Sequence, residues 1–170
     1  VSQERIDRSP APLWICAQAL RDPGNIGTIL RTGDAVGAGG LILVDECADP
    51  FSVEAVRASM GAVFTQAVAA APWDQFLGWL RSGPGQLVGT TLKASRDYLE
   101  PDYEKPCFLL IGNEQQGLPE AYEAECDSLV KIPMAGRADS PNAAAAAAVM
   151  AFAVKASWRN GNGRATVDSA

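Results

Sequence analysis

The chain has 170 residues, of which 48% are apolar and 20% are charged. This size and composition are typical of one globular domain that buries a core without disulfides or metals. No apolar run is long enough to cross a bilayer, and the first residues lack the basic-then-apolar layout of a secretion signal. The sequence therefore favours a cytoplasmic protein with no membrane partner. It begins with Val rather than Met, which fits either a processed start or a domain of a longer protein.

The titratable residues exclude several kinds of chemistry. No histidine is present, which excludes Ser-His and Cys-His nucleophile pairs and any histidine general base. The cysteines lie far apart without a C-x-x-C pair, so we expect free thiols and no metal site. They are Cys16, Cys47, Cys107 and Cys126.

The formal net charge of −6 does not indicate a nucleic-acid binder. A local basic surface is still compatible with the sequence, because four arginines fall near the ends of predicted elements. They are Arg21, Arg31, Arg57 and Arg137.

Apolar runs alternate with segments of helical periodicity along the whole chain. The predicted strands span residues 13–17, 41–44, 65–70, 87–91, 107–111 and 129–132. The predicted helices span residues 26–36, 51–60, 73–80 and 119–125, and one long helix follows residue 140. Continuous apolar strands separated by helices are typical of a buried parallel sheet. The sequence therefore predicts an α/β fold with a parallel sheet of about six strands and helices on both faces.

No internal repeat or domain boundary interrupts this pattern. We expect residues 1–12 to form an N-terminal extension or linker and residues 13–159 to form the single folded domain. Residues 160–170 are small and polar, and we expect them to form a disordered tail.

Three polar, glycine-bearing loops follow predicted strands, at residues 22–32, 111–119 and 132–142. Ligands in open α/β sheets bind beyond the carboxyl ends of the strands. The three loops are therefore the first candidates for a functional site.

The first loop offers an asparagine and an arginine. Asn25 stands where a helix N-cap is expected, and capping would give it a purely structural role. Capping leaves Arg31 unexplained, since Arg31 lies one turn above Gly27, whose missing side chain leaves room for a ligand. Arg31 is equally compatible with a solvated arginine that pairs with Asp34.

The second loop places Glu114 between Gly112 and Gly117, a spacing that lets the backbone curl closely around a ligand. An exposed acid ahead of a helix is also common, so this motif alone is weak.

The third loop contains Ser140 and Pro141, which together are a strong helix start with Ser140 as the cap. Asn142 is not needed for that cap, so it is a stronger candidate for a chemical role. The alanines at 143–148 that follow predict a thin helix that neighbours can approach closely.

Taken together, the three loops resemble the SpoU/TrmH class of SPOUT methyltransferases, from about residue 13 to residue 158. They match Asn-x-Gly-x-x-x-Arg-Thr, Gly-x-Glu-x-x-Gly-Leu, and Ile-Pro-Met-x-Gly followed by Ser-x-Asn, in that order. Residues 57–62 resemble the stretch that follows the first motif. The chain departs from the family at residues 141–144, where Pro-Asn-Ala-Ala replaces a frequent Leu-Asn-Val-Ser and a hydroxyl is absent.

The resemblance implies a C-terminal deep trefoil knot, bound S-adenosylmethionine, no metal, and methyl transfer to a ribose 2′-hydroxyl of rRNA or tRNA. It also implies a homodimer whose active sites draw residues from both subunits. Residues 13–159 would then be a SpoU-type methyltransferase domain. The alternative is a catalytically inactive knotted module for RNA binding or ribosome assembly, motivated by the acidic charge and the altered third loop. The presence of all five polar site residues weighs against that alternative.

The resemblance assigns three groups of residues. The catalytic group comprises Asn25, Arg31, Glu114, Ser140 and Asn142. The cofactor-binding group comprises Thr90, Thr91, Leu92, Leu110, Ile111, Gly112, Asn113, Gly117, Ile132, Met134, Ser140 and Asn142. The RNA-binding group comprises Arg21, Arg31 and Arg57. For Arg31 we favour phosphate binding over a role as base, because a guanidinium is essentially always protonated.

Overall fold

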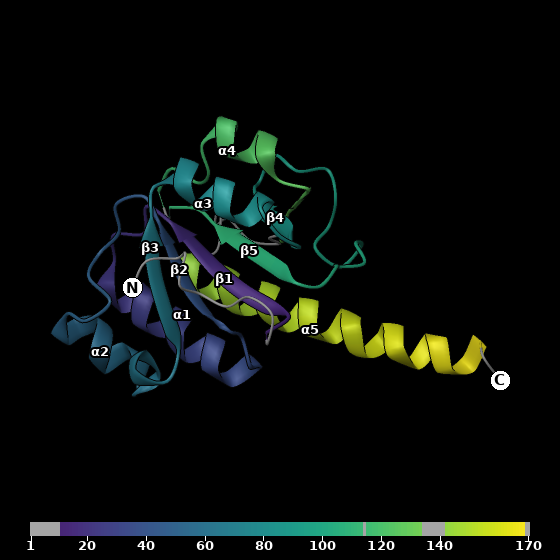
Figure 1. Cartoon of the computed structure of the whole chain (residues 1–170), viewed down its shortest axis with the longest axis horizontal. Coiled ribbons are helices and arrows are strands. Elements are labelled where there is room, and N and C mark those ends of the chain that lie inside the picture. Colours follow the sequence, from purple (N-terminus) through teal and green to yellow (C-terminus); the bar gives the residue numbers. More distant parts are fainter. Residues whose placement is uncertain (1–10, 114, 134–141, 169–170) are drawn as a thin grey trace.

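A parallel sheet forms the centre of the computed structural model, which describes residues 11–113, 115–133 and 142–168. The strand order is β3-β2-β1-β5-β4-β6, and every pairing is parallel (Figure 1). The strands are β1 Leu13–Gln18, β2 Gly40–Val44, β3 Ala67–Ala71, β4 Gln86–Thr90, β5 Cys107–Ile111 and β6 Ser128–Val130. The predicted parallel α/β sheet is confirmed, with small shifts at the strand ends.

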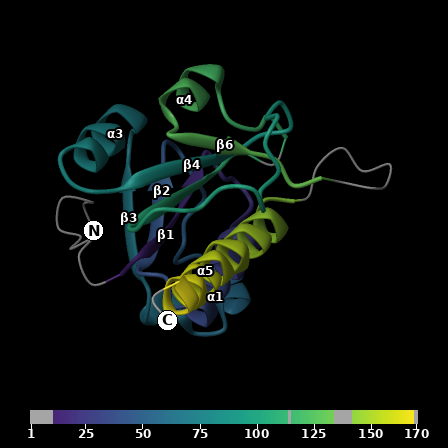
Figure 2. The ribbon, with the colours of Figure 1, turned by 90° about the vertical axis from the view of Figure 1, so that its right-hand side faces the viewer.

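Helices cover both faces of the sheet, as predicted. They are α1 Pro23–Val36, α2 Val53–Ser59, α3 Trp73–Arg81, α4 Glu120–Glu125 and α5 Ala143–Asp168, with a 3₁₀ turn η2 at Ala62–Phe64. Figures 1 and 2 show α3 and α4 on one face and α1, α2 and α5 on the other.

Strand β1 supplies core residues to both layers. Leu13 and Ile15 pack into the cluster that includes α1 and α5, whereas Trp14 and Cys16 pack into the cluster that includes α3. This alternation follows from the strand period of two and explains why the whole strand is apolar. All four cysteines are free thiols, as expected, and Cys16 and Cys107 are buried.

The N-terminus of α1 differs from the prediction. Asp22, not Asn25, is the N-cap: its Oδ1 accepts hydrogen bonds from the backbone N–H groups of Gly24 at 2.8 Å and Asn25 at 3.3 Å. Pro23 then occupies the first helical position, where a missing N–H costs nothing. Asn25 lies inside the first turn, so capping does not account for its side chain.

Gly27 is also used differently from the prediction. A Cβ on Gly27 would lie 2.3 Å from the carbonyl oxygen of Ala55 and 2.6 Å from the Cβ of Ala58. Both residues belong to α2, so the space beside Gly27 is occupied by that helix and not by a ligand. The absence of a side chain at Gly27 lets the backbones of α1 and α2 approach each other closely.

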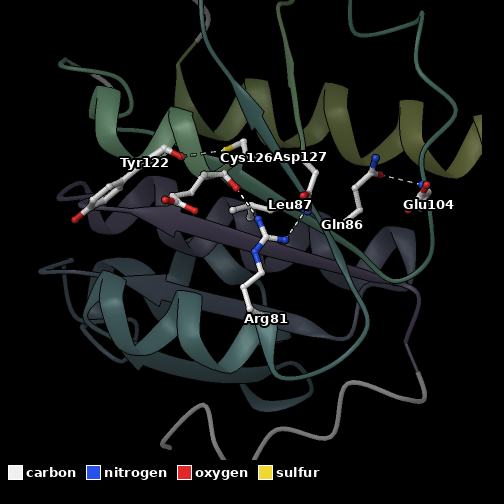
Figure 3. Close-up of polar contacts among 8 residues, drawn as sticks. Arg81, Gln86, Leu87, Glu104, Tyr122, Cys126 and Asp127 are labelled. Carbon is white, nitrogen blue, oxygen red and sulfur yellow. Dashed lines mark hydrogen bonds and ion pairs between the residues drawn. The ribbon is translucent and has the colours of Figure 1, made fainter.

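An ion pair fixes the entry to β6 beside β4 (Figure 3). The guanidinium of Arg81, in the last turn of α3, lies 2.9 Å from the carboxylate of Asp127 and also donates to the Glu125 carbonyl at 2.6 Å. The same carboxylate accepts from the backbone N–H of Leu87 at 2.7 Å. Asp127 therefore holds β6 in register on β4, while Arg81 holds α3 over that edge of the sheet.

The segment between β4 and β5 contacts the chain on both sides of the third loop. The backbone N–H of Lys131, just after β6, donates to the Arg96 carbonyl, and the Lys131 carbonyl accepts from the Tyr98 N–H. Further along, the Tyr103 carbonyl accepts from the indole N–H of Trp158 on α5 at 2.7 Å. The predicted trefoil knot stays a prediction, because residues 134–141 lie outside the described part of the chain.

Helix α5 extends through Asp168 and past the sheet (Figure 1). The described helix thus enters residues 160–170, which were expected to be disordered. Adding residues to a helix that has already formed requires no new nucleus, which explains how the polar segment can continue it. The division of the chain at residues 12 and 159 stays a prediction.

Gly27→Ala should destabilise the protein, because the added methyl group collides with the α2 backbone. We expect a loss of about 1 to 3 kcal/mol in the free energy of unfolding, measured by urea denaturation. Gly78→Ala is the matched control: Gly78 lies in α3 with no atom near its absent Cβ, so alanine should be neutral or stabilising there. Equal effects of the two substitutions would contradict the packing argument.

Candidate functional site

A cavity of about 250 Å³ opens at the carboxyl ends of β4 and β5. Its walls come from the residues after β4, the second loop after β5, the chain leaving β6 and the first turn of α5. The lining residues are Thr90, Thr91, Leu92, Lys93, Ile111, Gly112, Asn113, Gln115, Gln116, Gly117, Leu118, Glu123, Ile132, Ala143 and Ala146. The cavity therefore lies at the edge of the sheet where the loops were expected to converge.

Most of the residues predicted to bind the cofactor line this cavity. They are Thr90, Thr91, Leu92, Ile111, Gly112, Asn113, Gly117 and Ile132. Leu110 is not among the lining residues; it is fully buried in the core on the α3 side of the sheet. Met134 and Ser140 lie outside the described residues, as does the predicted catalytic Glu114.

Other lining residues were not predicted. Gln115, Gln116 and Leu118 belong to the second loop, and Lys93 directly follows the predicted residues 90–92, so neighbourhood in sequence could have indicated them. Glu123 and Ala146 could not be found in this way, because they reach the cavity only through the packing of α4 and α5. Lys93 also forms an ion pair with Glu120 at 3.3 Å, and both side chains are largely exposed. Such a pair contributes little to stability.

The second loop folds back on itself beside the cavity. A Cβ on Gly112 would lie 2.6 Å from the backbone of Gly117 and Leu118, so glycine is required by the close approach of the chain to itself. Gly117 has φ of 69°, in the left-handed region that favours glycine. Its N–H donates to the Asn113 carbonyl at 2.9 Å and closes the loop. Both glycines thus shape the loop itself.

Asn142 caps α5, which corrects the prediction that it is not needed for a cap. Its side-chain oxygen accepts from the N–H of Ala145 at 2.7 Å, and its carbonyl accepts from Ala146 at 2.9 Å. The predicted cap at Ser140 and Pro141 falls outside the described residues. Asn142 was also predicted to bind the cofactor, but it is not among the lining residues; it directly precedes Ala143, which is one of them.

The first loop does not contribute to the cavity within one chain. Asn25 and Arg31 are absent from its lining. Arg31 is exposed on α1 and makes no ion pair within the described residues, so the alternative pairing with Asp34 is not observed. Arg21 and Arg57 are also exposed, the first just after β1 and the second on α2. Arg137 lies outside the described residues.

A partly buried polar cluster supports the same edge of the sheet. Asp45, just after β2, accepts hydrogen bonds from the Tyr122 hydroxyl at 2.6 Å, the Gln18 amide at 3.1 Å and the Trp73 N–H at 2.9 Å. Burial raises the pKa of Asp45, but these hydrogen bonds outweigh burial and lower it overall. Burial and the bond to Asp45 raise the pKa of Tyr122 to about 12. The cluster joins α3 and α4 to the ends of β1 and β2.

The described residues contain neither a cluster suited to a metal ion nor a membrane-spanning helix. No group of three or more His, Cys, Asp or Glu side chains there is placed to hold a metal ion. Within the same ranges, no helix is both long and apolar enough to cross a membrane.

The fold and the cavity define an open-sheet α/β domain with a cavity beyond its strand ends, the place where ligands bind in such sheets. Residues 12–152 match the model of the SpoU rRNA Methylase family. The chain therefore belongs to the SpoU family, and the resemblance seen in the sequence is confirmed.

Known relatives agree with this assignment. The chain is 41% identical over 156 residues to a 23S rRNA (uridine(2479)-2′-O)-methyltransferase of Streptomyces viridochromogenes, covering 86% of this chain and 54% of the relative. It resembles the crystal structure of an AdoMet-bound rRNA methyltransferase from Sinorhizobium meliloti, with a TM-score of 0.87 and 46% identity, over 91% of this chain and 60% of that one.

The cofactor-bound structure of AviRb, a SpoU methyltransferase from Streptomyces viridochromogenes, also gives a TM-score of 0.87. It is 35% identical and covers 94% of this chain and 65% of that one. The chain spans about half the length of the curated relative named above.

Asn142 offers a test of its capping role. Asn142→Ala removes the cap and should lower the free energy of unfolding by about 1 kcal/mol. Asn142→Asp keeps an acceptor for the Ala145 N–H and places a negative charge at the helix N-terminus, so it should retain wild-type stability. Thermal unfolding of both variants checks this, and equal destabilisation would contradict capping by the side-chain oxygen.

Proposed function

We propose that this chain is the catalytic domain of an S-adenosylmethionine-dependent methyltransferase that modifies a ribose 2′-hydroxyl of rRNA or tRNA. The observation that carries the proposal is the cavity: it is lined by most of the residues that the family resemblance assigns to the cofactor, at the carboxyl edge of the sheet. The cofactor-bound relatives support the same assignment. A cytoplasmic location follows from an rRNA or tRNA substrate.

The chemistry of the cavity fits S-adenosylmethionine. Its apolar side chains, Ile111 and Ile132 among them, suit the adenine, and the Thr90 and Thr91 hydroxyls suit a ribose. Glu123 offers a carboxylate for the cationic end of the ligand, and Lys93 offers an ammonium for its carboxylate. Bound S-adenosylmethionine supplies an electrophilic methyl group on its sulfonium.

The residues of this chain then have to orient the ribose. Arg31 carries a planar, permanently charged guanidinium that can bind a substrate phosphate through two hydrogen bonds. We assign it that positioning role. The cap uses the side-chain oxygen of Asn142 and not its amide N–H groups, and Asn142 directly precedes Ala143 in the cavity wall. We assign to them the role of holding the ribose in line with the methyl group.

We further propose a homodimer in which each active site combines Arg31 of one subunit with Asn142 of the other. Two observations support it. Arg31 and Asn25 do not reach the cavity of their own chain, so a single chain leaves the proposed site incomplete. Helix α5, which begins at the cavity, also exposes Val149 by 38% and Phe152 by 54%, an apolar surface that suits a second subunit.

Arg31→Ala and Asn142→Asp should each reduce methyl transfer to RNA by roughly 100-fold or more, because each removes an orienting group. The measurement is transfer of a labelled methyl group to rRNA and tRNA, with the modified nucleotide mapped. Arg159→Ala, which truncates an exposed arginine far along α5, is the matched control and should retain activity. Near-normal transfer by both site variants would overturn the assigned roles, and failure of the wild type to bind S-adenosylmethionine in calorimetry would favour the inactive module.

Mixing two inactive variants tests the shared site. In a heterodimer of Arg31→Ala and Asn142→Asp, one of the two sites contains both wild-type residues, so mixing and re-association should restore activity. Light scattering should also show that Phe152→Glu weakens the dimer, because it places a charge on the apolar surface of α5. Phe64→Glu places the same charge on an exposed phenylalanine of η2, outside α5, and should leave the dimer intact. No recovery on mixing would contradict a site shared in this way.

A further inference from the structure

We propose that Asn113 is a positioning residue: its side-chain amide fixes the second loop against the end of β1 and thereby sets the shape of the cofactor cavity. The inference rests on the proposed function. It concerns a residue that the family resemblance assigned to the cofactor-binding group. The hydrogen bonds of its side chain point to a different role.

The side-chain oxygen of Asn113 is already committed within the loop. It accepts hydrogen bonds from the backbone N–H groups of Gln115 at 2.8 Å and Gln116 at 3.1 Å. An amide oxygen has two lone pairs, and these two donors use both. The oxygen therefore holds the turn of the loop and has no capacity left for a ligand.

The side-chain nitrogen of Asn113 makes a long-range contact. It donates to the backbone carbonyl of Ala19 at 2.7 Å, across 94 residues of sequence. Ala19 directly follows β1 and has φ of 51°, an unusual conformation for a residue with a side chain. The segment that it begins leads within a few residues to Asp22, the N-cap of α1. This one hydrogen bond thus joins the cavity loop to the connection between β1 and α1.

The position of this hydrogen bond allows it to influence the shape of the cavity. Gly112, Gly117 and Leu118 surround Asn113 in the loop, and all three line the cavity. Strand β5 holds the loop at one end and α4 holds it at the other. Between these ends, the Asn113 amide attaches the loop to Ala19, the residue after β1. Loops held only at their ends sample many conformations, so an internal attachment reduces the entropy lost when a ligand binds.

Two substitutions separate the functions of the amide. Asn113→Asp keeps an oxygen for the Gln115 and Gln116 N–H groups, but it turns a second oxygen towards the Ala19 carbonyl and replaces attraction with repulsion. Asn113→Ala removes both sets of hydrogen bonds without adding charge. If the attachment to Ala19 matters, both variants are impaired; if only the turn matters, the aspartate variant behaves as wild type.

The experiment measures the affinity for S-adenosylmethionine by calorimetry and the KM and kcat of methyl transfer, together with the melting temperature. We expect Asn113→Asp and Asn113→Ala to raise both the Kd and the KM for S-adenosylmethionine by roughly tenfold. At saturating S-adenosylmethionine, kcat should change less than KM. A merely structural role would instead lower the active fraction and kcat and leave the Kd of the folded protein unchanged. Gln75→Ala, which truncates an exposed amide on α3, is the control and should leave the Kd, KM, kcat and melting temperature unchanged.

The outcomes distinguish this inference from the proposed function. If the wild type binds S-adenosylmethionine and Asn113→Asp binds it equally well, the positioning role is overturned and the proposed function stands. If the wild type does not bind S-adenosylmethionine, both are overturned. A raised KM in the alanine variant alone would show that the oxygen holds the turn and that the bond to Ala19 is unimportant, which also overturns the inference.

Discussion

The parallel direction of all the strand pairings is the constraint on which the rest of the structure depends. It forces every connection to cross a face of the sheet, which is why helices cover both faces and why strands β1, β2 and β5 are buried and apolar. It also brings the carboxyl ends of the strands to one edge. The residues after β4, β5 and β6 meet there although they are far apart in the sequence, and the cavity forms where they meet.

Hydrogen bonds between loops hold that edge together. Asp45 joins the ends of β1 and β2 to α3 and α4, and Asn113 joins the loop after β5 to the residue after β1. Pro72, at the N-terminus of α3, has no side chain that can cap the helix; the Asp45 carboxylate accepts the Trp73 N–H in its place. Polar groups that are partly removed from water cost free energy unless they are paired, so such contacts favour one arrangement of the loops.

The hydrophobic periodicity of short segments made most strands and helices predictable. Where the predicted start of a strand or helix was wrong, the cause is also a short-range contact. The strand expected from residue 65 begins at residue 67 because the N–H groups of Thr65 and Gln66 bond to Ala62 and complete the turn of η2. The helix expected from residue 51 begins at residue 53 because Ser52 caps it, accepting from the Ala55 N–H. Both causes are weak side-chain or turn preferences that periodicity does not detect.

The order of the strands and the packing between distant elements could not be predicted from the sequence pattern. Alternating strands and helices do not specify that β5 lies beside β1, or that α2 fills the space next to Gly27. The motif residues were assigned because the resemblance supplied a family arrangement, and the second loop lies beside the cavity. Glu123 and Ala146 had no such guide, because their place in the cavity depends on how α4 and α5 pack.

Asn142 illustrates why structural and chemical roles are not alternatives at this edge. A helix N-cap needs one acceptor, and the side-chain oxygen of Asn142 provides it. The remaining amide N–H groups then have a fixed direction, because the cap immobilises the side chain on a helix whose first turn lines the cavity. Serine or aspartate would cap the helix equally well, but neither carries an N–H donor in its side chain. Asparagine is therefore the residue that satisfies the cap and also carries the N–H donor on which the proposed role of Asn142 depends.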